Sequence, residues 1–233
     1  IGADPREIVW TSGATESDNL AIKGAAHFYK GKGRHLVTVR TEHKAVLDVM
    51  RELERQGFEV TYLDVQPDGL LDLEAFGAAL RPDTILASVM LVNNETGCLF
   101  PVADIARLLK ERGSRALLHC DAVQGFLKVP CAPAGWGVDL MSLSAHKIGG
   151  PKGIGALYVR PDLRNLRPLL AGGGQEEGLR SGTEATAQIA GFAKAVALRQ
   201  EGLEEKLAHM ARIKAYCRER LLSIPGVVPV GGG

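Results

Sequence analysis

The segment VDLMSLSAHKIGGPKGIGALYV, residues 138–159, decides the architecture that the sequence predicts. Its two apolar runs, 138–143 and 154–159, predict two neighbouring strands joined by a short glycine-rich loop. A loop this short leaves no room for the helix that connects parallel strands. The two strands are therefore expected to pair antiparallel.

Earlier in the chain, apolar runs of strand length alternate with patterns of helical spacing. The other predicted strands cover 8–11, 35–39, 60–65, 85–92 and 116–122, and the predicted helices cover 16–30, 44–56, 72–80, 102–112 and 184–200. This alternation is typical of parallel strands with helical crossovers. The sequence thus predicts an α/β fold with a mostly parallel seven-stranded sheet wrapped by helices and one antiparallel pairing.

The loop between the last two strands contains a candidate catalytic lysine. Lys147 ends the tetrapeptide Ser144-Ala145-His146-Lys147, just before the glycine-rich stretch. A lysine whose pKa is lowered by its surroundings can form a Schiff base with an aldehyde cofactor, and the hydroxyl of Ser144 and the imidazole of His146 can hold that cofactor's phosphate. Pyridoxal 5'-phosphate is the natural candidate. The alternative is a solvated surface charge.

A second element suits the same cofactor. The apolar run 117–120 ends at Asp121, and Gln124 follows three residues later. A carboxylate beside the pyridine nitrogen of pyridoxal phosphate keeps the ring protonated and able to accept electrons, and an amide can donate to the phenolic oxygen. The alternative for Asp121 is a helix cap.

A third element follows the first predicted strand. Small and polar residues at 11–17, including Ala14 and Thr15, precede a helical pattern. Free amides and the positive end of the dipole at a helix start suit a phosphate, although the same residues would also serve as a simple cap. This turn follows the end of a predicted strand, where ligands collect in such sheets. The other candidate residues, His43, Asn94, Asp121 and residues 144–147, each follow the end of another predicted strand.

Composition limits the function classes. The 233 residues are 45% hydrophobic and 24% charged, with a net charge of +1. A chain of this kind can bury a sizeable core, and its charge gives no reason to expect a nucleic acid or an anionic membrane as partner. Neither a membrane-spanning run nor an export leader is recognisable, so the cytoplasm is the default location.

The four cysteines lack both the paired spacing of a metal site and the density of a disulfide scaffold. They are interpreted as free thiols, and no metal is expected. Cys120 and Cys217 are expected to be buried packing residues. Cys98 follows a polar turn at a strand end and could lie near the pocket.

Several strings carry a family resemblance. TSGATESDN, RTEHKAVLD, VNNETG, DAVQ, SAHKIGGPKGIGALYVR and GGGQEEGLRSGT occur in this order over nearly the whole chain. They resemble the cysteine desulfurases of the class V aminotransferase family, which supply sulfur for iron–sulfur clusters. The resemblance implies the large domain of the type I fold of pyridoxal-phosphate enzymes, and a homodimer.

The resemblance also implies a role for individual residues. Lys147 would carry the cofactor, His43 would stack on its ring, and Asn94 would lie near the substrate carboxylate. Asp121 would face the pyridine nitrogen, with Gln124 at the phenolic oxygen. The phosphate would be held by Ala14, Thr15, Ser144 and His146, and by Thr183 of the neighbouring subunit. Lys44 and Lys152 would be non-catalytic neighbours.

The implied reaction removes sulfur from L-cysteine, giving L-alanine and a persulfide on an enzyme cysteine for iron–sulfur and thio-cofactor synthesis. None of the four cysteines matches the position of that nucleophile, which in the family follows the RSGT string. The chain is therefore expected to be a fragment, with a large domain at 1–202 that lacks its first part and the start of a small domain at 203–233. The helix over 203–222 would then be exposed and prone to aggregation, and a strand could begin at 227–230.

Two alternatives stay open at this point. A selenocysteine lyase or another class V lyase would share the same cofactor residues. A non-catalytic scaffold for iron–sulfur assembly or sulfur-acceptor proteins would have no need of Lys147.

Overall fold

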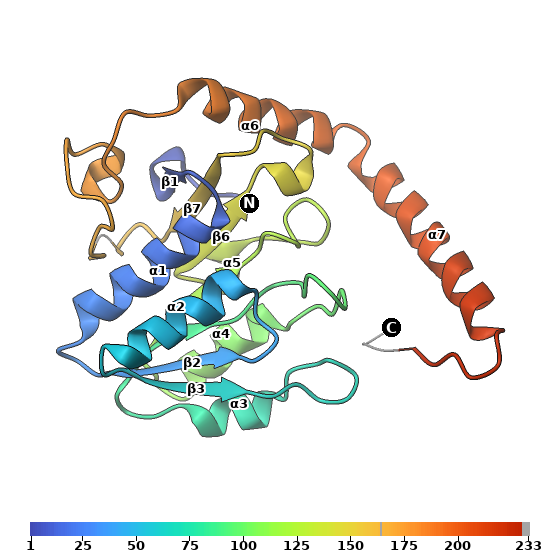
Figure 1. Cartoon of the computed structure of the whole chain (residues 1–233), viewed down its shortest axis with the longest axis horizontal. Coiled ribbons are helices and arrows are strands. Elements are labelled where there is room, and N and C mark those ends of the chain that lie inside the picture. Colours follow the sequence, from blue (N-terminus) through green and yellow to red (C-terminus); the bar gives the residue numbers. More distant parts are fainter. Residues whose placement is uncertain (164, 230–233) are drawn as a thin grey trace.

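The computed structural model describes residues 1–163 and 165–229 as a seven-stranded sheet covered by helices on both faces (Figure 1). The strands are β1 (Ile8–Thr11), β2 (His35–Val39), β3 (Glu59–Leu63), β4 (Thr84–Ser88), β5 (Leu117–Asp121), β6 (Leu140–Ser144) and β7 (Gly155–Val159). The helices are α1 (Ala14–Tyr29), α2 (Lys44–Arg55), α3 (Leu73–Ala79), α4 (Val102–Glu111), α5 (Pro133–Trp136), α6 (Thr186–Gln200) and α7 (Leu203–Leu222), with short 3-10 helices at Pro5–Glu7, His146–Ile148 and Glu176–Gly178. The predicted fold class is confirmed.

The strand order is β1-β7-β6-β5-β4-β2-β3. Strands β2 to β6 pair in parallel, whereas β7 runs antiparallel to both of its neighbours, β6 and β1. The expectation of a single antiparallel pairing was therefore wrong. The predicted pairing of β6 with β7 is present, but β7 also separates β6 from β1, and this long-range neighbour creates a second antiparallel ladder.

Side chains alternate between the two faces of the sheet along each strand and pack into two separate hydrophobic cores. One face of the sheet packs under α1 and α2, with Leu36, Leu86 and Leu140 among its buried residues. The other face packs under α3, α4 and α6. All five residues are buried in each of β2, β4, β5, β6 and β7, whereas the edge strands β1 and β3 are partly exposed. This burial explains why the central strands have nearly continuous apolar sequences.

The apolar run predicted as a strand over 85–92 extends beyond β4. Val89, Met90 and Leu91 are buried and lie beyond the end of β4, although the amides of Val89 and Leu91 still donate to the carbonyl oxygens of His119 and Asp121 at 3.0 and 2.8 Å. A run of apolar residues reports burial, not strand geometry, so its end could not be located from the pattern.

The helix α7 has no buried residue and extends away from the sheet (Figure 1). The expected exposure of this helix is confirmed, and Cys217 on it is exposed instead of buried. Residues 227–229 have no regular secondary structure, and Val230 of the predicted strand lies outside the described residues, as do residues 231–233. No helix in the described part of the chain is long and apolar enough to cross a membrane.

Candidate functional site

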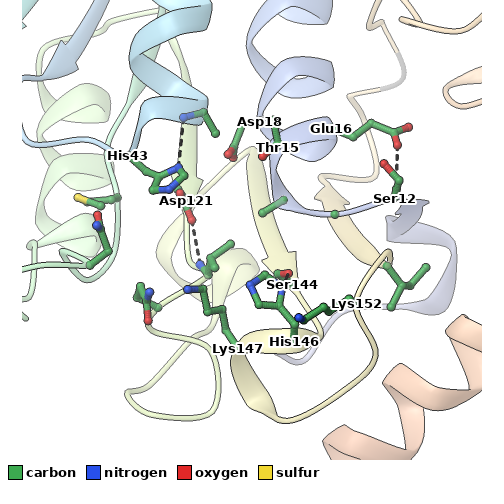
Figure 2. Close-up of a pocket in the computed structure, with 18 of the residues that line it drawn as sticks. Ser12, Thr15, Glu16, Asp18, His43, Asp121, Ser144, His146, Lys147 and Lys152 are labelled. Atoms are coloured by element: carbon green, nitrogen blue, oxygen red, sulfur yellow. Dashed lines mark hydrogen bonds between the residues drawn. The ribbon is translucent and has the colours of Figure 1, made fainter.

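A cavity of about 560 Å³ opens at the carboxyl ends of the parallel strands (Figure 2). Turns that follow five different strands contribute to its wall, as expected for a wound α/β sheet. Nine of the predicted site residues line it: Ala14, Thr15, His43, Asn94, Asp121, Gln124, Ser144, His146 and Lys147. The predicted convergence of these segments is thus present in the structure.

Asp121 is the last residue of β5 and is buried at the base of the cavity. Its Oδ1 atom accepts a hydrogen bond of 2.9 Å from the amide of Val123, which fixes the orientation of the carboxyl group. Burial raises the pKa of Asp121, while the Val123 amide, His43 and Lys147 act in the opposite direction. The alternative of a helix cap is wrong, because a turn and no helix follows Asp121, and the bond from Val123 N–H belongs to that turn.

Lys147 lies in the 3-10 helix that follows β6, and its side chain is exposed to the cavity. Among the described residues, Lys147 Nζ makes no hydrogen bond or ion pair, so its amine is available to a ligand. The nearby positive charge of Lys147 also acts on His146, whose pKa is lowered first by burial and then by Lys147 and Lys152. This rim of the cavity therefore favours an anion.

The start of α1 adds amide donors to the same rim. Gly13 is the N-cap of α1 and has no side chain that could accept hydrogen bonds from the first amides of the helix. These amides are therefore available to an anion. Thr11 Oγ1 donates to Gly13 O at 3.1 Å, which holds the turn in place. The turn also lies against β7, where a Cβ atom on Gly155 would come within 2.6 Å of Gly13, so this close approach requires glycine.

Two hydrogen bonds orient other side chains of the rim and wall. Ser144 Oγ and His146 Nδ1 are 2.8 Å apart, which links the two predicted phosphate ligands. His43 is the N-cap of α2, and its Nδ1 accepts from Ala45 N at 3.2 Å, which leaves the rest of the ring facing the cavity. The routine capping role and the predicted pocket role of His43 therefore apply to the same side chain.

Gln124 is held by a residue that the sequence did not single out. Lys128, four residues later in the turn after β5, donates from its Nζ to Gln124 Oε1 at 3.1 Å. With its oxygen occupied, Gln124 presents its amide nitrogen as the remaining polar group, which suits a hydrogen-bond donor to a ligand oxygen. No sequence signal indicated this pair, because residues 123–128 form a turn in which a spacing of four does not by itself bring two side chains together.

Other predicted residues lie elsewhere. Thr183 is exposed in the loop before α6 and does not line the cavity. Lys152 does line it, whereas Lys44 lines an adjacent groove between α1 and α2. Cys98 is buried outside the cavity, with its Sγ 3.5 Å from the carbonyl oxygen of Asp68.

Three residues near Asp121 were missed. Asp18 of α1, Glu42 before α2, and His119 of β5 are buried, and the pKa of His119 is lowered to about 3 by burial. Asp18 lies within the quoted string TESDN, but nothing in its local pattern distinguishes it from an exposed helical residue. Its burial depends on the packing of α1 across the sheet.

Comparisons with known proteins give a consistent result. A cysteine desulfurase IscS of Methylococcus capsulatus is 60% identical over 225 residues, which cover 96% of this chain and 54% of that protein. A cysteine desulfurase IscS of Neisseria meningitidis is 58% identical over 215 residues, with 92% and 53% covered. The chain thus spans about half the length of the curated relatives it matches.

Solved structures agree with the sequence relatives. A NifS-like protein superposes with a TM-score of 0.89 and 42% identity, over 95% of this chain and 60% of that one. A structure described as SspA in complex with cysteine gives a TM-score of 0.80 and 44% identity, over 90% and 62%. The model of the aminotransferase class V family matches residues 1–231. This chain belongs to the class V aminotransferase family.

Proposed function

We propose that the chain forms the cofactor-binding body of a cysteine desulfurase that uses pyridoxal 5'-phosphate. The reaction converts L-cysteine to L-alanine and passes the sulfur, as an enzyme persulfide, to iron–sulfur cluster and thio-cofactor synthesis. The observation that carries this proposal is the meeting of an unpaired lysine, a strand-end carboxyl group and an anion-suited rim in one cavity. The two IscS relatives support the substrate.

The residues of the cavity fit the cofactor. Lys147 would bind its aldehyde, Asp121 would face the ring nitrogen, and Gln124 would donate to the phenolic oxygen. The phosphate would be held by the first amides of α1, at Ala14 and Thr15, and by Ser144 and His146. His43 would cover one face of the ring, and Asn94 would lie near the substrate carboxylate. When bound, pyridoxal phosphate supplies a ring that accepts electrons from the substrate's alpha carbon.

The chain's own groups then move protons and hold the substrate. In its neutral form, Lys147 Nζ would take the alpha proton of cysteine. The ionised carboxylate of Asp121 keeps a proton on the ring nitrogen. The sulfur passes to a cysteine thiolate, which forms a sulfur–sulfur bond as the substrate's carbon–sulfur bond breaks. The electron pair of the broken bond stays with the substrate carbon, which takes up a proton to become the methyl group of alanine. We place that cysteine outside these 233 residues, because Cys98, Cys120, Cys131 and Cys217 do not line the cavity.

Four further parts of the proposal concern the whole enzyme. Residues 1–202 form the cofactor domain, and residues 203–233 form the connection to a small domain. Two copies of the enzyme associate, and Thr183 reaches the phosphate of the neighbouring subunit. Iron–sulfur scaffold or sulfur-acceptor proteins take up the sulfur. The enzyme works in the cytoplasm, where unpaired cysteines stay reduced.

The test is borohydride reduction of the purified full-length protein, followed by intact mass and peptide mapping. We expect one pyridoxyl adduct on Lys147, and none in the Lys147→Ala variant. Lys152→Ala is the matched control, because Lys152 also lines the cavity and should leave the adduct in place. An adduct on Lys152, or adduct formation that survives Lys147→Ala, would refute the assignment. A protein that takes no adduct at all would favour the non-catalytic scaffold.

The substrate is tested separately by measuring alanine released from L-cysteine and from selenocysteine under the same conditions. Faster release from cysteine is the expected result. Turnover of selenocysteine alone would instead indicate a selenocysteine lyase built on the same cofactor site.

A further inference from the structure

Two buried carboxyl groups lie near Asp121, and one of them, Asp18, also lines the cavity. Asp18 comes from α1, with a side chain that is 1% exposed, and Glu42 comes from the turn between β2 and α2. Figure 2 shows Asp18 reaching from α1 toward the region of Asp121. Burial, and then the nearby charge of Asp121, raise the pKa of both groups well above their usual values. Three acids from three elements therefore share one water-poor region.

The partners of Asp18 and Glu42 do not compensate a negative charge. Glu42 Oε1 accepts from the amide of Met90 at 2.5 Å, but its Oε2 has no partner among the described residues. Neither oxygen of Asp18 makes a well-formed hydrogen bond within that part of the chain. A buried carboxylate with so few donors is far less stable than the neutral acid.

His119 does not supply the missing positive charge. Its Nε2 is 3.5 Å from Asp18 Oδ1, but burial lowers the pKa of His119 to about 3, so the imidazole is neutral at physiological pH. Its ring nitrogens are hydrogen-bonded to hydroxyl groups, at 2.8 Å to Ser88 and 3.0 Å to Ser142. No lysine or arginine in residues 1–163 and 165–229 forms an ion pair with Asp18 or Glu42.

Asp121 has a different environment. It receives the Val123 amide at 2.9 Å, and His43 and Lys147 both favour its charged form. Asp121 and Asp18 both line the cavity, whereas Glu42 does not. Cys120, the other titratable group nearby on β5, is a neutral thiol because burial raises its pKa. Of the groups in this region, Asp121 is therefore the one best able to hold a negative charge.

We propose that Asp18 and Glu42 are positioning residues of the cofactor site, held as neutral carboxylic acids beside Asp121, so that Asp121 carries the single negative charge available to the cofactor's ring nitrogen. The identity of that cofactor rests on the proposed function. Because Asp18 and Glu42 are neutral, the site holds its one negative charge on Asp121, without a second carboxylate that would repel it.

The first test is infrared spectroscopy of the full-length enzyme carrying its cofactor, with carbon-13 in its aspartate and glutamate side chains. Neutral carboxylic acids have a C=O stretch well separated from carboxylate bands, and the isotope identifies it. We expect such signals at neutral pH, with one lost in Asp18→Asn and another in Glu42→Gln. The control Asp48→Asn changes an exposed acid on α2 and should leave both signals. Their absence from the unmodified enzyme, or their survival in both variants, would overturn the proposal.

The second test is the pH dependence of unfolding between pH 6 and 8. A neutral acid in the folded state becomes a carboxylate in the unfolded chain, so the folded state binds the extra proton and stability falls as the pH rises. Each such group raises the unfolding equilibrium constant about tenfold per pH unit. We expect Asp18→Asn and Glu42→Gln each to reduce the pH dependence of the unfolding equilibrium constant by one factor of about ten per pH unit. Asp48→Asn should leave this pH dependence unchanged.

Equal pH dependence in the unmodified protein and in the double variant would contradict the proposal. If one variant does not fold, the other variant and the labelled unmodified enzyme still decide the outcome. Neither test requires turnover. Neutral-acid signals in a protein without desulfurase activity would refute the proposed function alone, whereas activity without these signals would refute only the role of Asp18 and Glu42.

Discussion

At the residue scale, the cavity depends on side chains that hold one another in place. Gln124 is the clearest case, because the bond from Lys128 Nζ determines which end of its amide faces a ligand. Lys128 is half-buried, and burial lowers its pKa, followed by the effects of Arg199 and Lys147. A residue outside the cavity lining therefore sets the hydrogen-bonding character of one within it.

The variant Lys128→Met tests this orientation while keeping most of the apolar stem. We expect the cofactor to bind about five-fold more weakly, because the freed amide can rotate and one hydrogen bond of about 1 kcal/mol is lost. The measurement is an absorbance titration of the cofactor-free, full-length protein. Lys110→Met on the exposed side of α4 is the control. An unchanged Kd in Lys128→Met would mean that Gln124 needs no support.

At the element scale, hydrogen bonds between polar side chains hold neighbouring strands in one alignment, which apolar packing alone does not specify. His35 begins β2, and its ring nitrogens are 2.8 Å from Thr84 Oγ1 on β4 and 2.8 Å from Thr61 Oγ1 on β3. It thereby ties together three parallel strands near the edge of the sheet. On the other side of the sheet, α6 packs against the loop that carries Lys147.

The pH dependence of stability should report on His35. Burial and then the charge of Arg81 lower its pKa, so the folded state binds its proton less well than the unfolded chain. The stability that His35 contributes is present above about pH 6.5 and is lost as the pH falls below it, by up to about 1.4 kcal/mol per pH unit. Urea unfolding at pH 7 and pH 5 should show a smaller loss in His35→Gln than in the unmodified protein. His209→Gln, exposed on α7, should behave as the unmodified protein does.

The contact between α6 and the Lys147 loop gives a second prediction at this scale. A Cβ atom on Gly191 of α6 would lie 2.6 Å from Pro151 Cγ. Alanine would gain about 1 kcal/mol of helix propensity, but the overlap costs about 1–3 kcal/mol in a packed contact. We therefore expect Gly191→Ala to lower the free energy of unfolding by about 1 kcal/mol and to weaken cofactor binding. Chemical denaturation measures the first effect, with Gln188→Ala on the exposed face as control. A more stable Gly191→Ala protein would mean that the loop yields without cost.

At the scale of the whole molecule, Thr183 is the predicted site residue that does not line the cavity. Thr183 is exposed in the loop 171–183, which Arg180 anchors to α1 through a 2.8 Å bond from its Nε to Glu16 Oε1. Within one chain, Thr183 does not line the cavity. This location agrees with the proposal that it acts on the neighbouring subunit.

Mixed dimers test that proposal. A dimer of one Lys147→Ala chain and one Thr183→Ala chain has one intact site if Thr183 acts across the interface, and no intact site if it acts within its own chain. We expect co-expression of the two differently tagged full-length variants to restore alanine release above the level of either variant alone. If the purified mixed dimer is no more active than the two parents, Thr183 does not serve the neighbouring subunit.

The sequence by itself determined the fold class and the approximate positions of the seven strands, and nine of the ten residues predicted for the site line the cavity. Strand and helix periods are local properties, and polar residues after parallel strands meet at one edge, so short motifs such as that around Lys147 were sufficient. Only the tertiary structure decided that β7 separates β1 from β6, that Lys128 orients Gln124, and that Asp18 and Glu42 lie near Asp121. The strand order and the buried acids depend on packing between segments far apart in the chain, and Lys128 can reach Gln124 only because the turn after β5 is folded as it is. No local pattern records such contacts.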